Sequence, residues 1–369
     1  MLIGKGVLSA IAYKWVVRQI VRRPKWRGIF VIRKAFYASR NCCSLSFVDG
    51  FVHDLGNNGG LESLMSKKPN FFIIGAPKCG TTSLAAWLAE HPNIYLSPIK
   101  EPFYFSHDIR HQWIHTWDQY LRLFESASSE HTAVGEASTS YLFSKVAVPT
   151  IEQRLPGARY IVMLRNPVDM AYALHEQQLR VFHENLSDFV QAWYLASKRR
   201  SGRQVPPGCP DPVLLDYPAW CRLGEQLKRL YTVVPRERVL VLVLDDVKKN
   251  PRREYLRVLD FLGVPDDGRQ VFPVHNPARE WRWSWFGKAL RGLSRGVAWA
   301  KHVKGVLPRR NLGVIRKLEA IGTRRRPRRP LPAEFRAELE RYFAEDIQLL
   351  EELLGRDLSF WRRGCVAAR

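Results

Sequence analysis

Residues 71–84 read Phe-Phe-Ile-Ile-Gly-Ala-Pro-Lys-Cys-Gly-Thr-Thr-Ser-Leu. The first four residues are apolar, which predicts a strand buried on both faces, as in a parallel sheet. Gly75 and Gly80 bound a loop, and the hydroxyl-bearing residues after it open a predicted helix. This order of elements is typical of phosphate binding, because free N–H groups and the positive end of the helix dipole face the ligand.

The loop departs from the common nucleoside-triphosphate pattern, which needs a lysine directly after its second glycine. Gly75 and Gly80 have the required spacing, but Thr81 follows Gly80 and the lysine lies inside the loop, at Lys78. Lys78 supplies the one full positive charge of the loop, and the hydroxyls of residues 81–83 add donors. A strand–helix turn without a ligand would need only the two glycines, so the added donors favour a phosphate site.

A second pattern follows another apolar strand, which is predicted at residues 160–164. It reads Arg-Asn-Pro-Val-Asp-Met-Ala-Tyr-Ala and spans residues 165–173. The loop matches P-K-x-G-T-T-S/A-L and the second segment resembles R-N-P-x-x-R-A-Y-S, the two signatures of sulfotransferases that use 3′-phosphoadenylyl sulfate (PAPS). The chain resembles this family from about Pro69 to Trp361, and it is most similar to bacterial-type members related to the heparan sulfate enzymes.

The resemblance implies an α/β fold with a P-loop-like central parallel sheet flanked by helices in a three-layer sandwich. It also implies a transferase that moves a sulfuryl group from PAPS to a hydroxyl or amine of a carbohydrate or small-molecule acceptor, with no metal required. Arg165 would contact the 3′-phosphate, since a guanidinium can bind phosphate through two parallel hydrogen bonds. The residues that the resemblance assigns to the cofactor are Lys78, Cys79, Gly80, Thr81, Thr82, Ser83 and Arg165.

Two positions depart from the family pattern. Ala173 stands where the family has a serine that binds the 3′-phosphate, and Met170 stands where an arginine is usual. One expected phosphate donor is therefore missing, which bears on cofactor affinity rather than on the class of cofactor. For Arg165 taken alone, a surface ion pair is the ordinary interpretation of an arginine at a strand end.

Sulfuryl transfer needs a base that removes the proton of the attacking group. Residues 100–105 resemble the family's K-E-x-H/Y-F-F, in which the glutamate is that base, so Glu101 and Lys78 are the expected catalytic residues. The alternative is a surface ion pair of Glu101 with Lys100 or Arg110. Three histidines are weaker candidates for the base: His107, His111 and His175.

A third segment, residues 135–142, resembles the family's G-E-K/A-x-P-x-Y-L. In the heparan enzymes a lysine after the glutamate lines the active site, whereas Ala137 stands here. Two interpretations of Glu136 stay open: it faces the acceptor, or it is an ordinary carboxylate at a strand end. The absent lysine argues against carrying polysaccharide specificity over directly.

The net charge of +23 is concentrated in two segments. Positions 1–69 hold 12 Lys/Arg and 3 Asp/Glu, and positions 281–330 hold 15 Lys/Arg and 1 Glu. The other residues hold 31 Lys/Arg and 31 Asp/Glu, so they carry no net charge. We therefore expect a basic N-terminal extension at 1–69, a sulfotransferase domain at 70–362 with a basic Trp/Arg-rich insert at 281–330, and a tail at 363–369. Apolar content of 46% and charged content of 25% are those of a globular protein.

The N-terminal extension has no apolar run long enough to span a bilayer, because Lys14, Arg18 and Arg22 interrupt it. It also lacks the pattern of a secretory signal. The interpretations left open are a basic amphipathic helix on a membrane surface, disorder, or a start of translation at Met65. The expected location is cytoplasmic, with peripheral membrane contact through residues 1–69 as an option.

The basic insert begins with tryptophans that alternate with other residues, at Trp281, Trp283 and Trp285. Aromatic and basic residues together can bind an acidic or sugar acceptor, an anionic membrane surface or nucleic acid. A solvated basic loop without a ligand is an equal alternative. We expect an acceptor as partner and no nucleic acid. The six cysteines have no metal-ligand spacing, so no metal site is expected.

Two other functions are alternatives to sulfuryl transfer. One is a P-loop nucleotide kinase or NTPase, although the lysine after Gly80 is missing and Asp245-Asp246 is the one candidate pair for magnesium. The other is a basic protein that binds nucleic acid or membranes and carries a degenerate enzyme core.

Further elements follow from local patterns. A strand is predicted at 238–244, and a helix with capping residues at both ends at 251–262. Residues 197–218, rich in Pro, Gly and Arg, are expected to form a mobile loop. One C-terminal helix is expected at 333–354.

Overall fold

The structure is a computed structural model, and the chain divides into two units, Met1–Leu64 and Met65–Arg369. The residues that the structure describes are 67–112, 114–275, 279–282, 286–287, 289–290, 292, 321–325 and 330–365. All of them belong to the second unit. The expectations for residues 1–66, for most of the basic insert and for residues 366–369 lie outside the described residues.

Five parallel strands form the central sheet, in the order β2-β3-β1-β4-β5. They are β1 (Phe71–Gly75), β2 (Ile94–Leu96), β3 (Ala133–Ala137), β4 (Arg159–Leu164) and β5 (Val239–Val243). β1 lies in the centre, with Ile73 opposite both Ala137 of β3 and Ile161 of β4. This is the continuous apolar strand that residues 71–74 predicted, because both of its edges and both of its faces are covered.

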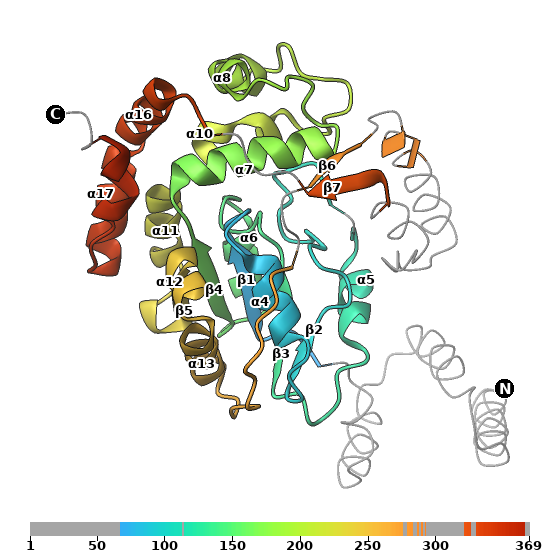
Figure 1. Cartoon of the computed structure of the whole chain (residues 1–369). Helices are drawn as coiled ribbons and strands as arrows, with labels where there is room; N and C mark the ends of the chain where they lie inside the picture. The colour runs from blue at the N-terminus through green and yellow to red at the C-terminus, as the bar shows by residue number, and fades with distance from the viewer. Residues whose placement is uncertain are drawn as a thin grey trace, which may run out of the picture. The chain divides into compact units, whose positions relative to one another are not determined.

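Helices cover both faces of the sheet (Figure 1). The chain moves outward from β1 through α4 (Thr81–Leu88) to the edge strand β2, and it returns from β3 through α6 (Ala147–Arg154) to β4. Because parallel crossovers are right-handed, connections that run in opposite directions place their helices on opposite faces. The predicted P-loop-like sheet between two helical layers is confirmed.

The remaining helices surround this frame. They are α5 (Trp117–Leu121), α7 (Pro167–Arg180), α8 (Phe189–Tyr194), α9 (Ala196–Arg200), α10 (Tyr217–Trp220), α11 (Leu223–Tyr231), α12 (Leu244–Lys249), α13 (Pro251–Leu262), α16 (Ala333–Tyr342) and α17 (Ala344–Leu354). Short 3₁₀ helices are η3 (Arg122–Phe124), η4 (Pro212–Leu215), η5 (Arg236–Arg238) and η6 (Ser359–Cys365). A small antiparallel pair, β6 (Arg279–Trp281) with β7 (Thr323–Arg325), joins the two ends of the basic insert.

The helix at Pro251–Leu262 has its predicted bounds, since Asn250 caps it and Gly263 ends it in the left-handed conformation. Two expectations were wrong. The C-terminal helix at 333–354 is split at Phe343 into α16 and α17. The expected loop at 197–218 contains α9, η4 and α10. The tail predicted from residue 363 begins within η6.

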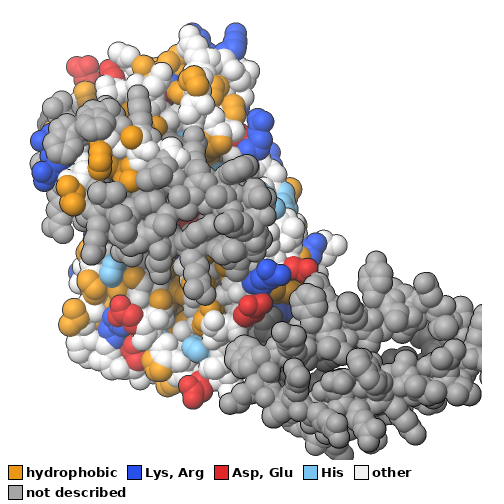
Figure 2. Space-filling model, turned by 90° about the vertical axis from the view of Figure 1, so that its right-hand side faces the viewer, with side chains coloured by type: hydrophobic (Ala, Val, Ile, Leu, Met, Phe, Trp, Pro, Cys, Tyr) orange, Lys and Arg blue, Asp and Glu red, His pale blue; other side chains and the backbone are white. Residues whose placement is uncertain are grey.

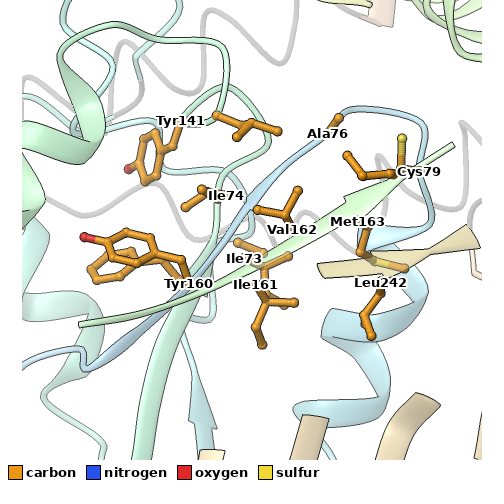
Figure 3. Packing of buried hydrophobic residues seen from close by; sticks show 14 of the residues in the cluster. Ile73, Ile74, Ala76, Cys79, Tyr141, Tyr160, Ile161, Val162, Met163 and Leu242 are labelled. Atoms are coloured by element: carbon orange, nitrogen blue, oxygen red, sulfur yellow. The ribbon is translucent and has the colours of Figure 1, made fainter. Parts of the chain in front are cut away.

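The strands β1 and β4 run side by side in the core. Phe71 to Ile74 are all fully buried, and the Phe72 ring stacks on Tyr160 with ring centroids 5.9 Å apart. Figure 3 shows Ile73 of β1 next to Ile161 and Val162 of β4. Burying each such side chain stabilises the fold by about 1.5–3 kcal/mol, so the strand that leads into the loop is firmly held.

The described surface does not share the charge excess of the whole chain. On the face in Figure 2, basic and acidic side chains lie interspersed over the described part. Among the described residues, no helix is both long enough and apolar enough to cross a bilayer.

Candidate functional site

The loop between β1 and α4, here called the glycine loop (residues 75–80), approaches its neighbours too closely for side chains at its two glycines. A Cβ on Gly75 would lie 2.8 Å from the Leu142 Cβ, and one on Gly80 would lie 2.9 Å from Leu244 Cδ1. Gly80 has φ 93°, a conformation that side chains disfavour, and it caps α4. Neither glycine position has room for a side chain. The glycine loop therefore offers backbone N–H groups at the start of α4.

Lys78 and Cys79 of the glycine loop have opposite surroundings. Lys78 is partly exposed and holds φ 64°, a left-handed conformation that is uncommon for lysine. The Cys79 side chain is fully buried, in the same cluster as Met163 (Figure 3), and its Sγ lies 3.8 Å from Met170 Sδ. Burial raises the pKa of Cys79 to about 12, so the thiol is neutral and only its backbone could meet a ligand.

Both ends of α4 bond to a segment from much later in the chain. The Ser83 hydroxyl accepts a hydrogen bond of 3.0 Å from the His275 N–H, and the Trp87 indole donates to the Pro273 carbonyl at 3.0 Å. Figure 1 shows this coil, which follows α13, crossing in front of α4. Thr81 is buried, whereas Thr82 is partly exposed, so Thr82 is the hydroxyl best placed toward solvent.

Arg165 joins the second sequence pattern to the glycine loop. Its Nη1 donates to the Lys78 carbonyl at 3.3 Å, and its Nη2 lies 3.8 Å from Asp169 Oδ2. The side chain is 14% exposed. The ion pair expected of an isolated strand-end arginine is therefore present, but the guanidinium also lies against the lysine-bearing loop. Asp169 is shared, since Arg336 of α16 bonds its other oxygen at 3.1 Å.

Glu101 reaches the same edge of the sheet from the segment after β2. Its N–H donates to the Ala137 carbonyl at 2.8 Å, and its Oε1 accepts from the Thr139 hydroxyl at 3.1 Å and from Lys100 Nζ at 2.7 Å. The Lys100 ion pair that was considered for Glu101 is thus present, whereas Arg110 pairs with Asp211 instead. Two donors to one oxygen stabilise a negative carboxylate there.

The structure brings Lys78, Arg165 and Glu101 to the carboxyl edge of the sheet. Ala76 N–H bonds to the Met163 carbonyl, which ties the glycine loop to the end of β4. Thr139, which holds Glu101, also packs against the glycine loop, since its carbonyl would lie 3.2 Å from a Cβ on Gly75. Ligands of open α/β sheets bind at this edge, where the connections diverge.

Comparison with known proteins decides the family. The family model described as "Sulfotransferase domain" matches residues 68–277, more than half of the chain. The chain belongs to this family. A solved sulfotransferase from Alicyclobacillus acidocaldarius is 28% identical with a TM-score of 0.59, and the alignment covers 80% of this chain and 99% of that one.

Curated relatives carry names of carbohydrate enzymes. "Carbohydrate sulfotransferase 15" of Rattus norvegicus is 27% identical in an alignment 271 residues long, which covers 58% of this chain and 47% of that protein. "Bifunctional heparan sulfate N-deacetylase/N-sulfotransferase 2" of Homo sapiens is 26% identical in an alignment 218 residues long, which covers 55% of this chain and 23% of that protein. The chain thus spans about half the length of the first of these relatives, and less of the second.

The third pattern of the sulfotransferase domain, residues 135–142, contains a buried carboxylate. Glu136, on β3, is fully buried. Its Oε1 accepts from the hydroxyls of Tyr120 at 3.0 Å and Tyr141 at 2.9 Å, and its Oε2 accepts from Ser138 at 2.7 Å. Of the two interpretations left open, direct contact with an acceptor does not fit a side chain without exposed surface. The second interpretation fits in part, because Glu136 lies at the end of β3, but its carboxylate is fully buried.

Glu136 makes stability depend on pH. Burial raises its pKa to about 7 from 4.5, against opposing hydrogen bonds from the three hydroxyls. A carboxyl with a raised folded pKa stabilises the fold fully below its unfolded pKa, and that contribution is lost as pH rises through the folded pKa. Relative to Glu136→Gln, which cannot ionise, the wild type should lose on the order of 3 kcal/mol of unfolding free energy between about pH 5 and pH 8.

Urea unfolding of both proteins at the two pH values measures this loss. Glu90→Gln is the control, because Glu90 is exposed and pairs with Arg269 at the surface. A difference between wild type and Glu136→Gln that is the same at both pH values would contradict the prediction.

The three histidines occupy different settings in the sulfotransferase domain. His107 is exposed. His175 is buried, and its Nε2 lies 2.8 Å from the Leu186 carbonyl. His111 lies nearer the predicted base, with its ring 4.0 Å from that of Phe103 and its Nε2 3.3 Å from Ser140 Oγ. Burial lowers the pKa of His111 to about 4, which makes it a weak proton acceptor at neutral pH.

The carboxylates proposed for magnesium in the kinase alternative have other partners. Asp246 accepts from Arg356 Nη1 at 2.5 Å, and Asp245 accepts from the Trp361 indole at 3.0 Å. Both bonds attach the C-terminal segment to α12. Within the described ranges, no three His, Cys, Asp or Glu residues lie together as a metal site would require.

Sequence reasoning missed the hydroxyls that follow β3. Ser138, Thr139 and Tyr141 bond either Glu101 or Glu136. A signal was present, because a run of hydroxyl residues directly after a buried strand lies at the ligand-binding edge of a parallel sheet. The bond from Tyr120 of α5 to Glu136 left no comparable pattern.

Proposed function

We propose that the chain transfers a sulfuryl group from PAPS to a hydroxyl or amine of an acceptor. The observation that carries this proposal is the hydrogen bond from Arg165 to the Lys78 carbonyl. It brings the two sequence signatures together, with Glu101 tied to the same sheet edge through Ala137 and Thr139. Membership of the sulfotransferase domain family supports the reaction class.

The donor set of the glycine loop suits a phosphosulfate. The loop offers an ammonium group at Lys78, backbone N–H groups at the start of α4 and a partly exposed hydroxyl at Thr82. PAPS, when bound, supplies the sulfuryl group and carries the leaving phosphate. Lys78 would neutralise the charge that develops on the leaving oxygen, and Arg165 would bind the 3′-phosphate.

Glu101 would remove the proton of the attacking acceptor. As the new O–S or N–S bond forms and the bond from sulfur to the leaving phosphate breaks, the acceptor proton passes to the Glu101 carboxylate. Both Lys78 and Glu101 hold left-handed backbone conformations, with φ 64° and 62°. Such conformations cost about 1–3 kcal/mol each and concentrate at functional sites, which supports these two roles.

A carbohydrate is the acceptor class that we propose first. The relatives named for carbohydrate and heparan sulfate sulfotransfer support it. Ala137 stands where the heparan enzymes have a lysine, so a polysaccharide of the heparan type is not implied. Contact of residues 1–69 with a membrane, and a cytoplasmic location, stay predictions.

A thermal-shift comparison tests the donor. We expect 3′-phosphoadenosine 5′-phosphate to raise the melting temperature more than ADP or ATP at equal concentration, because only it carries the 3′-phosphate for Arg165. The shift should be lost in Lys78→Ala and in Arg165→Ala. Arg238→Ala is the control, since this partly buried arginine pairs with Glu152 at the amino end of β5. An equal shift with ATP, or no shift, would overturn the proposal.

A further inference from the structure

Two of the hydroxyls that bond Glu136 also accept hydrogen bonds from the segment that carries Glu101. The Phe103 N–H donates to Ser138 Oγ at 3.2 Å, and the Phe105 N–H donates to the Tyr141 hydroxyl at 3.3 Å. Each hydroxyl thus stands between the buried carboxylate and one backbone N–H. We call residues 101–106 the Glu101 turn.

The carboxylate fixes the direction of these bonds. Above its pKa of about 7, Glu136 is ionised and only accepts hydrogen bonds, so Ser138 and Tyr141 then direct their protons toward it. Their lone pairs are then left for the N–H groups of Phe103 and Phe105. Replacing the carboxylate by a group that also donates removes this constraint on the two hydroxyls.

The Glu101 turn needs such an anchor, because its backbone is strained. Glu101 has φ 62° and Phe103 has φ 55°, both in the left-handed region. Non-glycine residues persist there only when surrounding contacts hold them. The ring of Tyr104 stacks on Tyr120 with centroids 4.9 Å apart, so aromatic packing adds to the two hydrogen bonds.

We propose that Glu136 is a positioning residue, which holds the Glu101 turn through Ser138 and Tyr141 and so presents Glu101 to the acceptor. The catalytic half of this statement rests on the proposed function. The anchoring half rests on the hydrogen bonds alone. Glu136 itself touches neither donor nor acceptor, because it is fully buried.

Hydrogen exchange of the unliganded protein tests the anchoring. We expect the peptide covering residues 100–106 to exchange about 5- to 10-fold faster in Ser138→Ala, Tyr141→Phe and Glu136→Gln. Each substitution removes or weakens one of the hydrogen bonds that link Glu136 to the Glu101 turn. Tyr160→Phe is the matched control, because Tyr160 also donates to a glutamate, Glu152, at 2.7 Å. Its removal should leave this peptide unchanged.

Steady-state kinetics with PAPS test the catalytic half. We expect kcat to fall about 10- to 100-fold in Ser138→Ala and Tyr141→Phe, with the KM for PAPS changed less than about 3-fold, because a misplaced base slows the chemical step. A rise in KM without a fall in kcat would overturn this role.

The outcomes separate the two proposals. Unchanged exchange in a folded Glu136→Gln, or in both Ser138→Ala and Tyr141→Phe, overturns the inference, whatever the activity of these variants. A wild type without PAPS-dependent turnover overturns the proposed function, and the exchange data then decide the anchoring alone. Ser138→Ala removes a single hydroxyl, so the test stands even if Glu136→Gln does not fold.

Discussion

Glu101→Gln should lower kcat about 100- to 10,000-fold, the range that general bases contribute. Glutamine keeps the volume of the side chain and can still accept from the Thr139 hydroxyl, but it cannot take up the acceptor proton. Binding of 3′-phosphoadenosine 5′-phosphate should be nearly unchanged, since the phosphate donors that we propose belong to the glycine loop and Arg165. Initial rates with PAPS and a thermal shift with the product nucleotide measure the two quantities.

The control for this variant is Glu90→Gln. Glu90 also pairs with a basic residue, Arg269, at 2.7 Å, but its side chain is 59% exposed and lies just after α4. Its replacement should leave kcat within about 2-fold of the wild type, as for an ordinary surface pair. If Glu101→Gln keeps wild-type turnover, Glu101 is only the surface partner of Lys100.

Arg199→Met should lower the free energy of unfolding by about 3–5 kcal/mol, because it leaves a buried carboxylate without its counter-charge. Arg199 is 1% exposed and Glu184 is fully buried, and the two form bonds of 2.5 and 2.9 Å. Tyr217 and the N–H groups of residues 185 and 186 complete the shell around Glu184. Methionine fills the space of the arginine stem but supplies no donor.

A surface ion pair provides the control. Arg222 pairs with Glu225 at 2.8 Å, and the two side chains are 42% and 57% exposed. Arg222→Met should therefore cost less than about 1 kcal/mol. Urea denaturation of the wild type and the two variants measures both losses of unfolding free energy. An equal loss in both variants would show that burial does not decide how much the Arg199–Glu184 pair stabilises the fold.

The Arg199–Glu184 pair is a feature that local sequence patterns could not predict. Residues 197–218, expected to form a loop, begin with a basic run and are rich in Gly and Pro, which is the composition of a solvated loop. The buried partner, Glu184, lies on a different segment, and no periodicity marks the pairing. The basic run therefore folds into α9 against expectation, because tertiary burial outweighs local composition.

Other parts of the site followed from local rules. The uninterrupted apolar run at 71–74 and the two glycines predicted β1 and the glycine loop, since their signals lie within ten residues. The approach of Arg165 to Lys78 followed from placing two strand ends at one sheet edge. The bond from Tyr120 to Glu136 could not be predicted, because α5 and β3 meet only in three dimensions.

The central position of β1 in the sheet also limits the order in which the strands can pair during folding. β1 is synthesised before the other described strands, yet its partners are β3 and β4, and the Arg165–Lys78 bond joins residues 87 positions apart. Pairings of such long sequence separation slow folding. During synthesis the apolar residues 71–74 therefore stay uncovered until β4 has left the ribosome. A nascent chain of this length exposes an aggregation-prone strand that a chaperone would recognise.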